Sequence, residues 1–199
     1  MFRKFTKRLI DGKSTTVENH TPSETVIDTI SSEEPASGLD LEQFMVADHR
    51  HCDELWAMVE AAVEARDGIG VAVQVFTEDF ERHLQREEEV IFPAFEDATG
   101  MHGVGPTMMM RHEHEQMRAV IAVMLQAHRA GDDQQLLSQG DTLLMLTQQH
   151  NMKEEQILYP MANQAIGGQW PELQERMGVR MDESVQPLRY ASLPRTRRS

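Results

Sequence analysis

Four long segments of the sequence place apolar side chains at steps of three and four residues. They cover residues 39–68, 69–100, 105–131 and 132–168, and each ends at glycine. This spacing puts the apolar residues on one face of a helix, which must be buried against other helices. Alternating strand patterns are nearly absent. Because the connections are short, we predict an all-α protein, an up-down-up-down four-helix bundle.

The sequence outside these segments has a different character. Residues 14–38 are rich in Ser, Thr, Glu and Pro without a sustained period, and with the basic residues 1–13 before them we predict an irregular or disordered leader over 1–38. Residues 39–167 form the predicted bundle. We expect a short amphipathic helix near 171–178 and a basic tail within the remaining residues, 168–199. A chain of 199 residues is long enough for one domain with a substantial core.

Each predicted helix interrupts its apolar stripe with one histidine, and the second and fourth add a glutamate one turn later. The pattern places Ile157 and Met161 in the core with the other apolar members. In chain order the stripes contain Met45, His49, Cys52, Trp56, Val59 and Val63; Val73, Phe76, Phe80, His83, Glu87, Val90 and Ala94; Met110, His114, Met117, Ile121 and Met124; and Leu143, Leu146, His150, Glu154, Ile157 and Met161.

The two halves of the bundle resemble each other in sequence. "HLQREEEVIFP" begins at His83 and "HNMKEEQILYP" at His150, 67 residues later, while "DH" at 48–49 and "EH" at 113–114 are 65 residues apart. Two helical hairpins related by a pseudo-twofold axis would bring all four stripes together at one level. We expect the proline that ends each matching segment, Pro93 or Pro160, to bend or end its helix.

Six polar groups in four core stripes need a physical explanation. A single buried histidine usually forms a hydrogen bond, but an unpaired buried carboxylate is very costly. A mutual network of charged His and Glu is one solution, although it desolvates both partners. A bound metal ion is the other solution, and we favour it.

The residue types narrow the choice of metal. With one cysteine a Cys-type zinc site is excluded. Imidazole and carboxylate suit iron, manganese or zinc. Six ligands best fit two iron ions bridged by the carboxylates and an oxo or hydroxo group.

The motifs resemble those of the hemerythrin-like (HHE) cation-binding domains. They are DH at 48–49, HxxxEE at 83–88, EH at 113–114 and HxxxEE at 150–155, and the resemblance covers about residues 40–165. It implies a non-haem di-iron protein that binds or reduces a small oxidant: dioxygen, peroxide or nitric oxide. Reduction would make it an enzyme. The alternative is a regulatory or binding module that senses iron or oxygen. The implied iron ligands are His49, His83, Glu87, His114, His150 and Glu154.

One departure from the oxygen-carrying hemerythrins concerns the third helix. Those proteins have two histidines four residues apart there, whereas Met110 and Arg118 flank His114 at that spacing. His112 is about 200° around the helix and should face outward. One iron therefore has an open or water-filled position, or takes a seventh ligand such as Glu113 or Glu88.

Several neighbouring residues have simpler interpretations. Asp48, Glu113, Glu88 and Glu155 are candidates to hold ligand imidazoles in place. We expect His51 to be exposed. Cys52 is expected to be a buried core residue, with a redox-active thiol as the alternative.

The charge distribution bears on partners and location. The net charge is −14, and because residues 1–13 and 185–199 each carry +4, residues 14–184 carry −22. Such an acidic body is a poor nucleic-acid binder. There is no apolar run long enough for a membrane span and no secretory signal pattern. We expect a cytoplasmic protein whose partner is a small ligand, with homo-oligomerisation left open.

Overall fold

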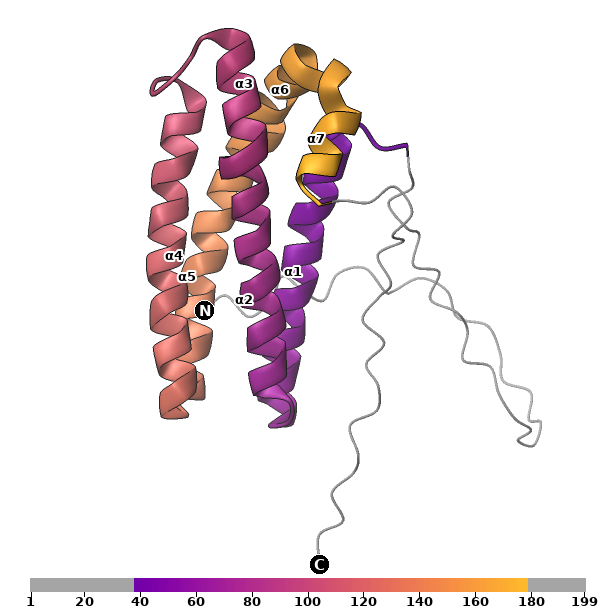
Figure 1. Cartoon of the computed structure of the whole chain (residues 1–199). Helices are drawn as coiled ribbons and strands as arrows, with labels where there is room; N and C mark the ends of the chain where they lie inside the picture. Colours follow the sequence, from indigo (N-terminus) through magenta and orange to yellow (C-terminus); the bar gives the residue numbers. More distant parts are fainter. Residues whose placement is uncertain (1–37, 179–199) are drawn as a thin grey trace, which may run out of the picture. The chain divides into compact units, whose positions relative to one another are not determined.

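The computed structural model describes residues 38–178, and these form a bundle of four long helical rods (Figure 1). Helix α1 is the first rod and α4 the third, whereas the second and fourth each contain a short π-helical turn between two α-helices. The elements are α1 Leu41–Ala65; α2 Ile69–Arg86, η1 Glu87–Ile91 and α3 Phe92–Thr99; α4 Pro106–Ala130; α5 Asp133–Lys153, η2 Glu154–Leu158 and α6 Tyr159–Ile166; and then η3 Gly167–Gln169 and α7 Trp170–Arg176.

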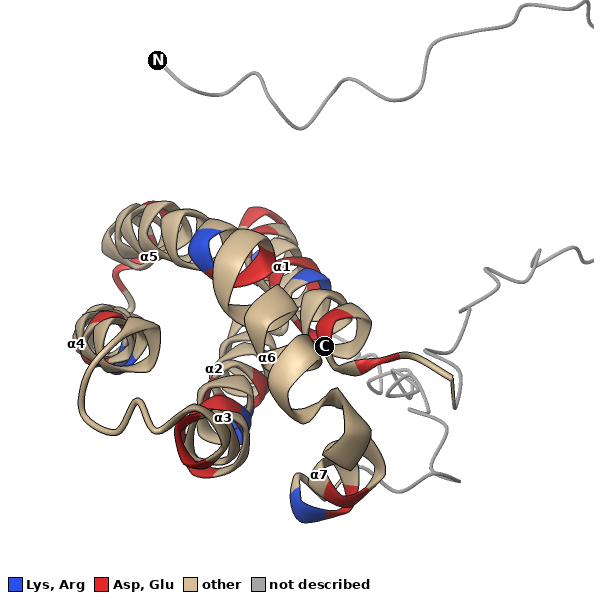
Figure 2. Cartoon of the chain, turned by 90° about the horizontal axis from the view of Figure 1, so that it is seen from above, with Lys and Arg blue, Asp and Glu red and all other residues tan. Residues whose placement is uncertain are grey.

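The rods run alternately up and down and surround a common axis (Figures 1 and 2). Helix α1 packs beside α2 and α4 beside α5, so each predicted hairpin is a pair of neighbours. No strand occurs among residues 38–178. The predicted all-α, up-down-up-down four-helix bundle is confirmed.

Local signals explain where the rods begin and end. The side chain of Asp40 accepts a hydrogen bond from the backbone N–H of Gln43, whose own side chain caps Asp40 in return, so α1 starts with a complete capping box. Pro106 occupies the first turn of α4, where its missing N–H has no intrahelical role. That helix ends at Gly131, whose φ of 69° is readily adopted by glycine.

The buried core consists of two apolar clusters along the bundle axis. The first is built around Trp56, Phe76 and Phe80. The second is built around Phe92 and Phe95 and includes the start of α1. Along every rod the predicted histidine lies between members of the two clusters, as His49 does between Met45 and Cys52. A polar layer therefore separates the two apolar clusters.

The π-helical turns correct two expectations. Each begins at a core glutamate and ends just before the proline-bearing helix. The N–H of Phe92 bonds to the carbonyl of Glu87, five residues back. Because the wider turn adjusts the hydrogen-bond ladder just before the proline, the helix continues through it for eight residues in α3 and again in α6. Pro93 and Pro160 therefore do not end their helices, so that part of the prediction is wrong, while the predicted bend stays a prediction.

The extra residue in the second π turn also shifts the buried face of the fourth rod. A regular α-helix would place Ile157 in the core, but it is 54% exposed, whereas Leu158 and Tyr159 are 1% and 0% exposed. Met161 is only half-buried, and Ala162 takes the buried position instead. The assignment of Ile157 to the core was wrong: the π turn brings Leu158 to the buried face, whereas Val90, its equivalent in the first π turn, is 7% exposed in a turn that α7 contacts.

The short predicted helix near 171–178 is α7, which begins one residue earlier at Trp170. It packs beside the first turn of α1. The indole N–H of Trp170 donates to the carbonyl of Leu39 at 2.8 Å, and its ring lies 5.3 Å from that of Phe44. Within residues 38–178 no helix has the length and apolar character needed to cross a membrane. The expected basic tail, and the expected leader apart from Gly38, lie outside the described residues.

Candidate metal centre

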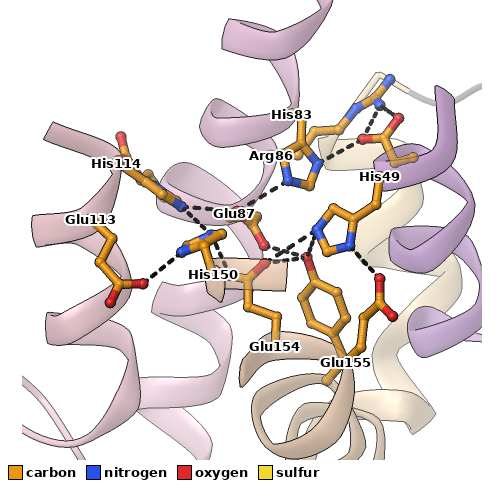
Figure 3. A network of polar contacts seen from close by, with 12 residues as sticks. His49, His83, Arg86, Glu87, Glu113, His114, His150, Glu154 and Glu155 are labelled. Carbon is orange, nitrogen blue, oxygen red and sulfur yellow. Dashed lines mark hydrogen bonds and ion pairs between the residues drawn. The ribbon is translucent and has the colours of Figure 1, made fainter. Parts of the chain in front are cut away.

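All six predicted ligands meet in the polar layer between the two apolar clusters. Figure 3 shows the imidazoles and the carboxylates of Glu87 and Glu154 pointing toward one another from different rods. Each rod supplies one histidine, and the two π turns supply the glutamates as their first residues. None of the six is more than 3% exposed; they are His49, His83, Glu87, His114, His150 and Glu154.

The six side chains form two sets of four that share both glutamates. One set adds His49 and His83, from α1 and α2; the other adds His114 and His150, from α4 and α5. Within each set the donor atoms lie within 4.8 Å of one another. The pseudo-twofold relation expected from the repeated motifs therefore appears as two equivalent His pairs on either side of two common carboxylates.

Distances within the sets match those between neighbouring ligands of one ion. Two donors about 2.0–2.2 Å from a metal and at right angles to each other lie roughly 3 Å apart. The Nε2 atoms of His49 and His150 are 3.2 and 3.1 Å from the two different oxygens of Glu154. The Nε2 atom of His114 is 3.2 Å from Glu87 Oε2. The arrangement is compatible with metal binding.

A ring of four outer carboxylates fixes the orientation of the four imidazoles. In each case the Nδ1–H of the imidazole donates to the carboxylate, so that Nε2 points into the centre. Each rod supplies the carboxylate for the histidine of the next rod, so the ring passes once around the bundle. The pairs are Asp48 with His83 at 3.1 Å, Glu88 with His114 at 2.8 Å, Glu113 with His150 at 2.9 Å, and Glu155 with His49 at 2.8 Å.

Three of these four carboxylates are held in turn by a basic side chain. Arg86 binds Asp48 through both oxygens, at 2.7 and 2.8 Å. Arg118 bridges Glu88 to Glu81, and Lys153 binds Glu113. Glu155 has no such ion pair with Lys or Arg among residues 38–178, and it is 39% exposed. The imidazole of His49 is thus linked through one carboxylate to solvent.

The electrostatics of the centre favour ionised carboxylates. Although burial alone would raise the pKa of Glu154, hydrogen bonds and charge from His150 and His49 hold it well below its usual range. Burial likewise opposes protonation of His150, but Glu154, Glu87 and Glu113 together raise its pKa to about 9. The pKa of His49 is raised for corresponding reasons. Such a concentration of buried negative charge attracts cations, whether protons or metal ions.

Two details indicate that metal ions suit these residues. Among the described residues, Glu87 Oε2 and Glu154 Oε1 are fully buried and lie 3.2 and 3.1 Å from the Nε2 atoms of His114 and His150, so they receive a hydrogen bond only when those nitrogens are protonated. The Nε2 atoms of His114 and His150 are only 3.1 Å apart. Because each of these imidazoles engages a carboxylate through Nδ1, their neutral forms would direct two lone pairs at each other. A cation placed among these atoms would bind the buried carboxylate oxygens and accept the lone pairs of both imidazoles.

Comparison with known families agrees with this geometry. The family model described as the hemerythrin HHE cation-binding domain matches residues 40–162. This chain belongs to the hemerythrin HHE family. Neither the curated proteins nor the solved structures with which the chain was compared include a match. The matched range begins at the cap of α1 and ends within α6, so the hemerythrin domain contains the whole ring of carboxylates and the centre.

The hemerythrin domain has one central residue that the sequence patterns did not single out. The hydroxyl of Tyr159 donates to Glu87 at 2.6 Å, contacts Glu154 at 3.0 Å and lies 3.0 Å from His49 Nε2. Its counterpart in the other half is Phe92, whose ring stacks on His114 with centroids 5.8 Å apart. Aligning the repeated segments pairs this tyrosine with this phenylalanine, which is the signal that could have identified it. The two halves of the centre are therefore chemically different.

Several residues near the ligands have roles other than binding a metal. Glu88 and Glu113 hold imidazoles through Nδ1, as proposed for them, and this geometry disfavours either as a seventh ligand. His51 and His112 are 45% and 70% exposed and lie outside the centre. Cys52 is buried, and burial together with nearby Asp48 and Asp53 raises its thiol pKa. A neutral, buried thiol fits the core role rather than the redox role.

Proposed function

We propose that this hemerythrin domain holds two iron ions and uses them to bind or reduce a small oxidant: dioxygen, peroxide or nitric oxide. His49 and His83 would serve one ion, and His114 and His150 the other. Glu87 and Glu154 would serve both. When bound, the iron pair would supply the electrons that an oxidant accepts.

The observation that carries this proposal is the sharing of two carboxylates between two His pairs. A single tetrahedral ion requires four ligands, whereas six donors in two overlapping sets suit a pair of ions. The two shared glutamates would neutralise part of the charge of two cations. Imidazole and carboxylate without thiolate are donors that suit iron, manganese or zinc. Family membership favours iron among these.

The chain's own residues would perform three tasks. The outer carboxylates hold each imidazole with Nε2 inward, which prepares the donors before any ion arrives. The apolar clusters on either side restrict water, so that charges in the centre act in a medium of low polarity. The hydroxyl of Tyr159 holds Glu87 and Glu154 in register from one side.

The direct test combines metal analysis with optical spectroscopy. The purified chain is loaded with ferrous iron without oxygen, its iron content is measured, and its visible spectrum is recorded before and after exposure to oxygen, peroxide or nitric oxide. The proposal expects two irons per chain and a new absorption band on exposure. Reversal under vacuum would identify a carrier, and consumption of peroxide an enzyme. A chain that takes up no iron, or whose iron does not respond to any of the three oxidants, would contradict it.

A further inference from the structure

A small cavity lies beside the centre, on the side opposite Tyr159. The imidazoles of His49, His83 and His150 form one wall of it, and side chains of the Trp56 cluster form much of the rest. It leaves about 10 Å³ for the centre of a water-sized molecule, close to the space that one water requires. The cavity therefore has room for about one water-sized molecule, which would contact imidazoles from both halves of the centre.

Thr147 lines this cavity and has an unusual hydroxyl group. It lies on α5 one turn before His150, its side chain is 8% exposed, and its Oγ1 is buried without a hydrogen-bond partner among the described residues. A buried hydroxyl in that condition is destabilising unless something binds it. No group of α5 forms a hydrogen bond with this hydroxyl.

The other threonines within residues 38–178 all have partners. Thr77, Thr99 and Thr142 donate to the backbone carbonyl four residues earlier, at 2.9, 2.7 and 3.1 Å. Thr107 donates to Glu96 at 2.6 Å. Bonding to the preceding turn is the usual arrangement for a threonine within a helix. Thr147 has the same opportunity and does not take it, which leaves its hydroxyl available to a molecule in the cavity.

A second cavity continues from the first toward the surface. Cys52, Phe80 and Thr147 line both, and the second reaches the exposed side chain of Asp53. Its walls are mostly apolar, and Gly140 contributes to them opposite Trp56. The two cavities together mark a route between α1 and α5 along which a small molecule could approach the three imidazoles, passing Thr147.

We infer that Thr147 is a positioning residue for the oxidant: its hydroxyl donates a hydrogen bond to a small oxygen- or nitrogen-containing ligand in the cavity beside the centre. This inference rests on the proposed function and adds to it the residue that orients the ligand. An oxygen or nitrogen atom with a lone pair accepts the O–H, while the apolar walls exclude larger polar molecules. The imidazoles offer no donor toward this ligand when their Nε2 atoms face metal ions. Thr147 and Asn151 are the other lining residues with strong donors, and of these Thr147 is the buried one whose hydroxyl has no partner.

The test uses azide, a small anion that accepts hydrogen bonds, added to the iron-loaded ferric protein. Thr147→Val keeps the shape of the side chain and removes the donor, and Thr147→Ser restores a hydroxyl. Thr142→Val, the same change on α5 at a hydroxyl that bonds to Ser138, is the matched control. Azide titrations followed by visible absorption should give a dissociation constant roughly tenfold weaker for Thr147→Val only.

A second measurement does not depend on iron or on azide. In the metal-free protein, Thr147→Val should raise the Tm, because it removes a buried hydroxyl without a partner, whereas Thr142→Val should not. If Thr147→Val lowers this Tm, or leaves the azide constant unchanged while the wild-type protein binds azide, the inference about Thr147 is overturned and the proposed function stands. If the wild-type chain holds no iron, or its ferric form binds no azide, the proposed function and the inference fail together.

Discussion

Replacing Glu154 with glutamine should weaken both metal positions at once. Its two oxygens lie 3.2 and 3.1 Å from the Nε2 atoms of His49 and His150, which belong to different sets. The side chain is fully buried, so solvent cannot replace the lost charge. Losing any single histidine would remove a donor from one set, whereas Glu154→Gln removes a charged donor from both.

The size of the effect follows from linkage between binding and folding. Iron at 100 times its dissociation constant stabilises the folded state by about 2.7 kcal/mol for each ion. If Glu154→Gln weakens binding about 100-fold, that stabilisation falls to about 0.4 kcal/mol at the same iron concentration. With both ions weakened, the stabilisation lost is about 4.6 kcal/mol, so the iron-dependent rise in Tm should shrink by roughly 9–18 °C for a chain of this size.

Thermal unfolding with and without ferrous iron, in the absence of oxygen, measures this difference directly. Glu115→Gln is the matched control, because that residue is 76% exposed and faces away from the centre. The control should keep the wild-type rise in Tm and the wild-type iron content. An unchanged iron-dependent rise in Glu154→Gln, together with full iron content, would refute the assignment of Glu154 as a shared ligand.

Three further perturbations test the electrostatics and packing of the bundle. Because the pKa of His150 is raised from 6.5 to about 9 in the folded, metal-free chain, its contribution to stability is complete below pH 6.5 and is lost as the pH rises through 9. Urea unfolding of the metal-free protein at pH 6 and pH 9.5 should show this decrease, and higher stability at pH 9.5 would contradict it. Tyr159→Phe should lower the unfolding free energy of the metal-free protein by about 1–3 kcal/mol, because the buried carboxylate of Glu87 loses its donor; an unchanged urea midpoint would show that the hydroxyl contributes nothing. Gly140→Ala should cost about 1–3 kcal/mol, because a Cβ there would lie 2.0 Å from the indole of Trp56. Gly70→Ala is its control, since the nearest side-chain atom would be 3.5 Å away, and equal urea midpoints for the two variants would count against the close packing at Trp56.

Much of the fold was predictable because helical periodicity reports the buried face directly. The stripes from Val73 to Ala94 and from Met110 to Met124 are buried as expected. Glycine and proline marked the connections, so the predicted ends of the rods agree closely with the structure. The failure at Ile157 has two parts: a π turn moves the buried face to Leu158, and the contact with α7 is made by the first π turn, where Val90 is buried. Two such turns at equivalent positions also let Pro93 and Pro160 lie inside continuing rods.

The sequence predicted which side chains meet in the centre, but it did not predict that the two halves of the centre differ. Six polar residues on core stripes had to meet somewhere, and the repeated motifs indicated that they meet at one level. The acidic residue beside four of the six ligands, as in Asp48 next to His49, anticipated the outer carboxylates. Which histidine each would hold depends on how neighbouring rods are rotated, and sequence spacing does not specify this. The polar contacts of Tyr159 were not predicted, because an aromatic residue on a helix usually indicates packing.

We propose above that two iron ions bind between the two His pairs. The most direct measurement is the iron content of the chain after anaerobic loading and removal of free metal, made on the wild-type protein and on His83→Ala and His150→Ala. We expect two irons per wild-type chain and a lower content in each variant, because each loses a ligand from a different set. Wild-type protein with no bound iron, or variants that keep both ions, would contradict it.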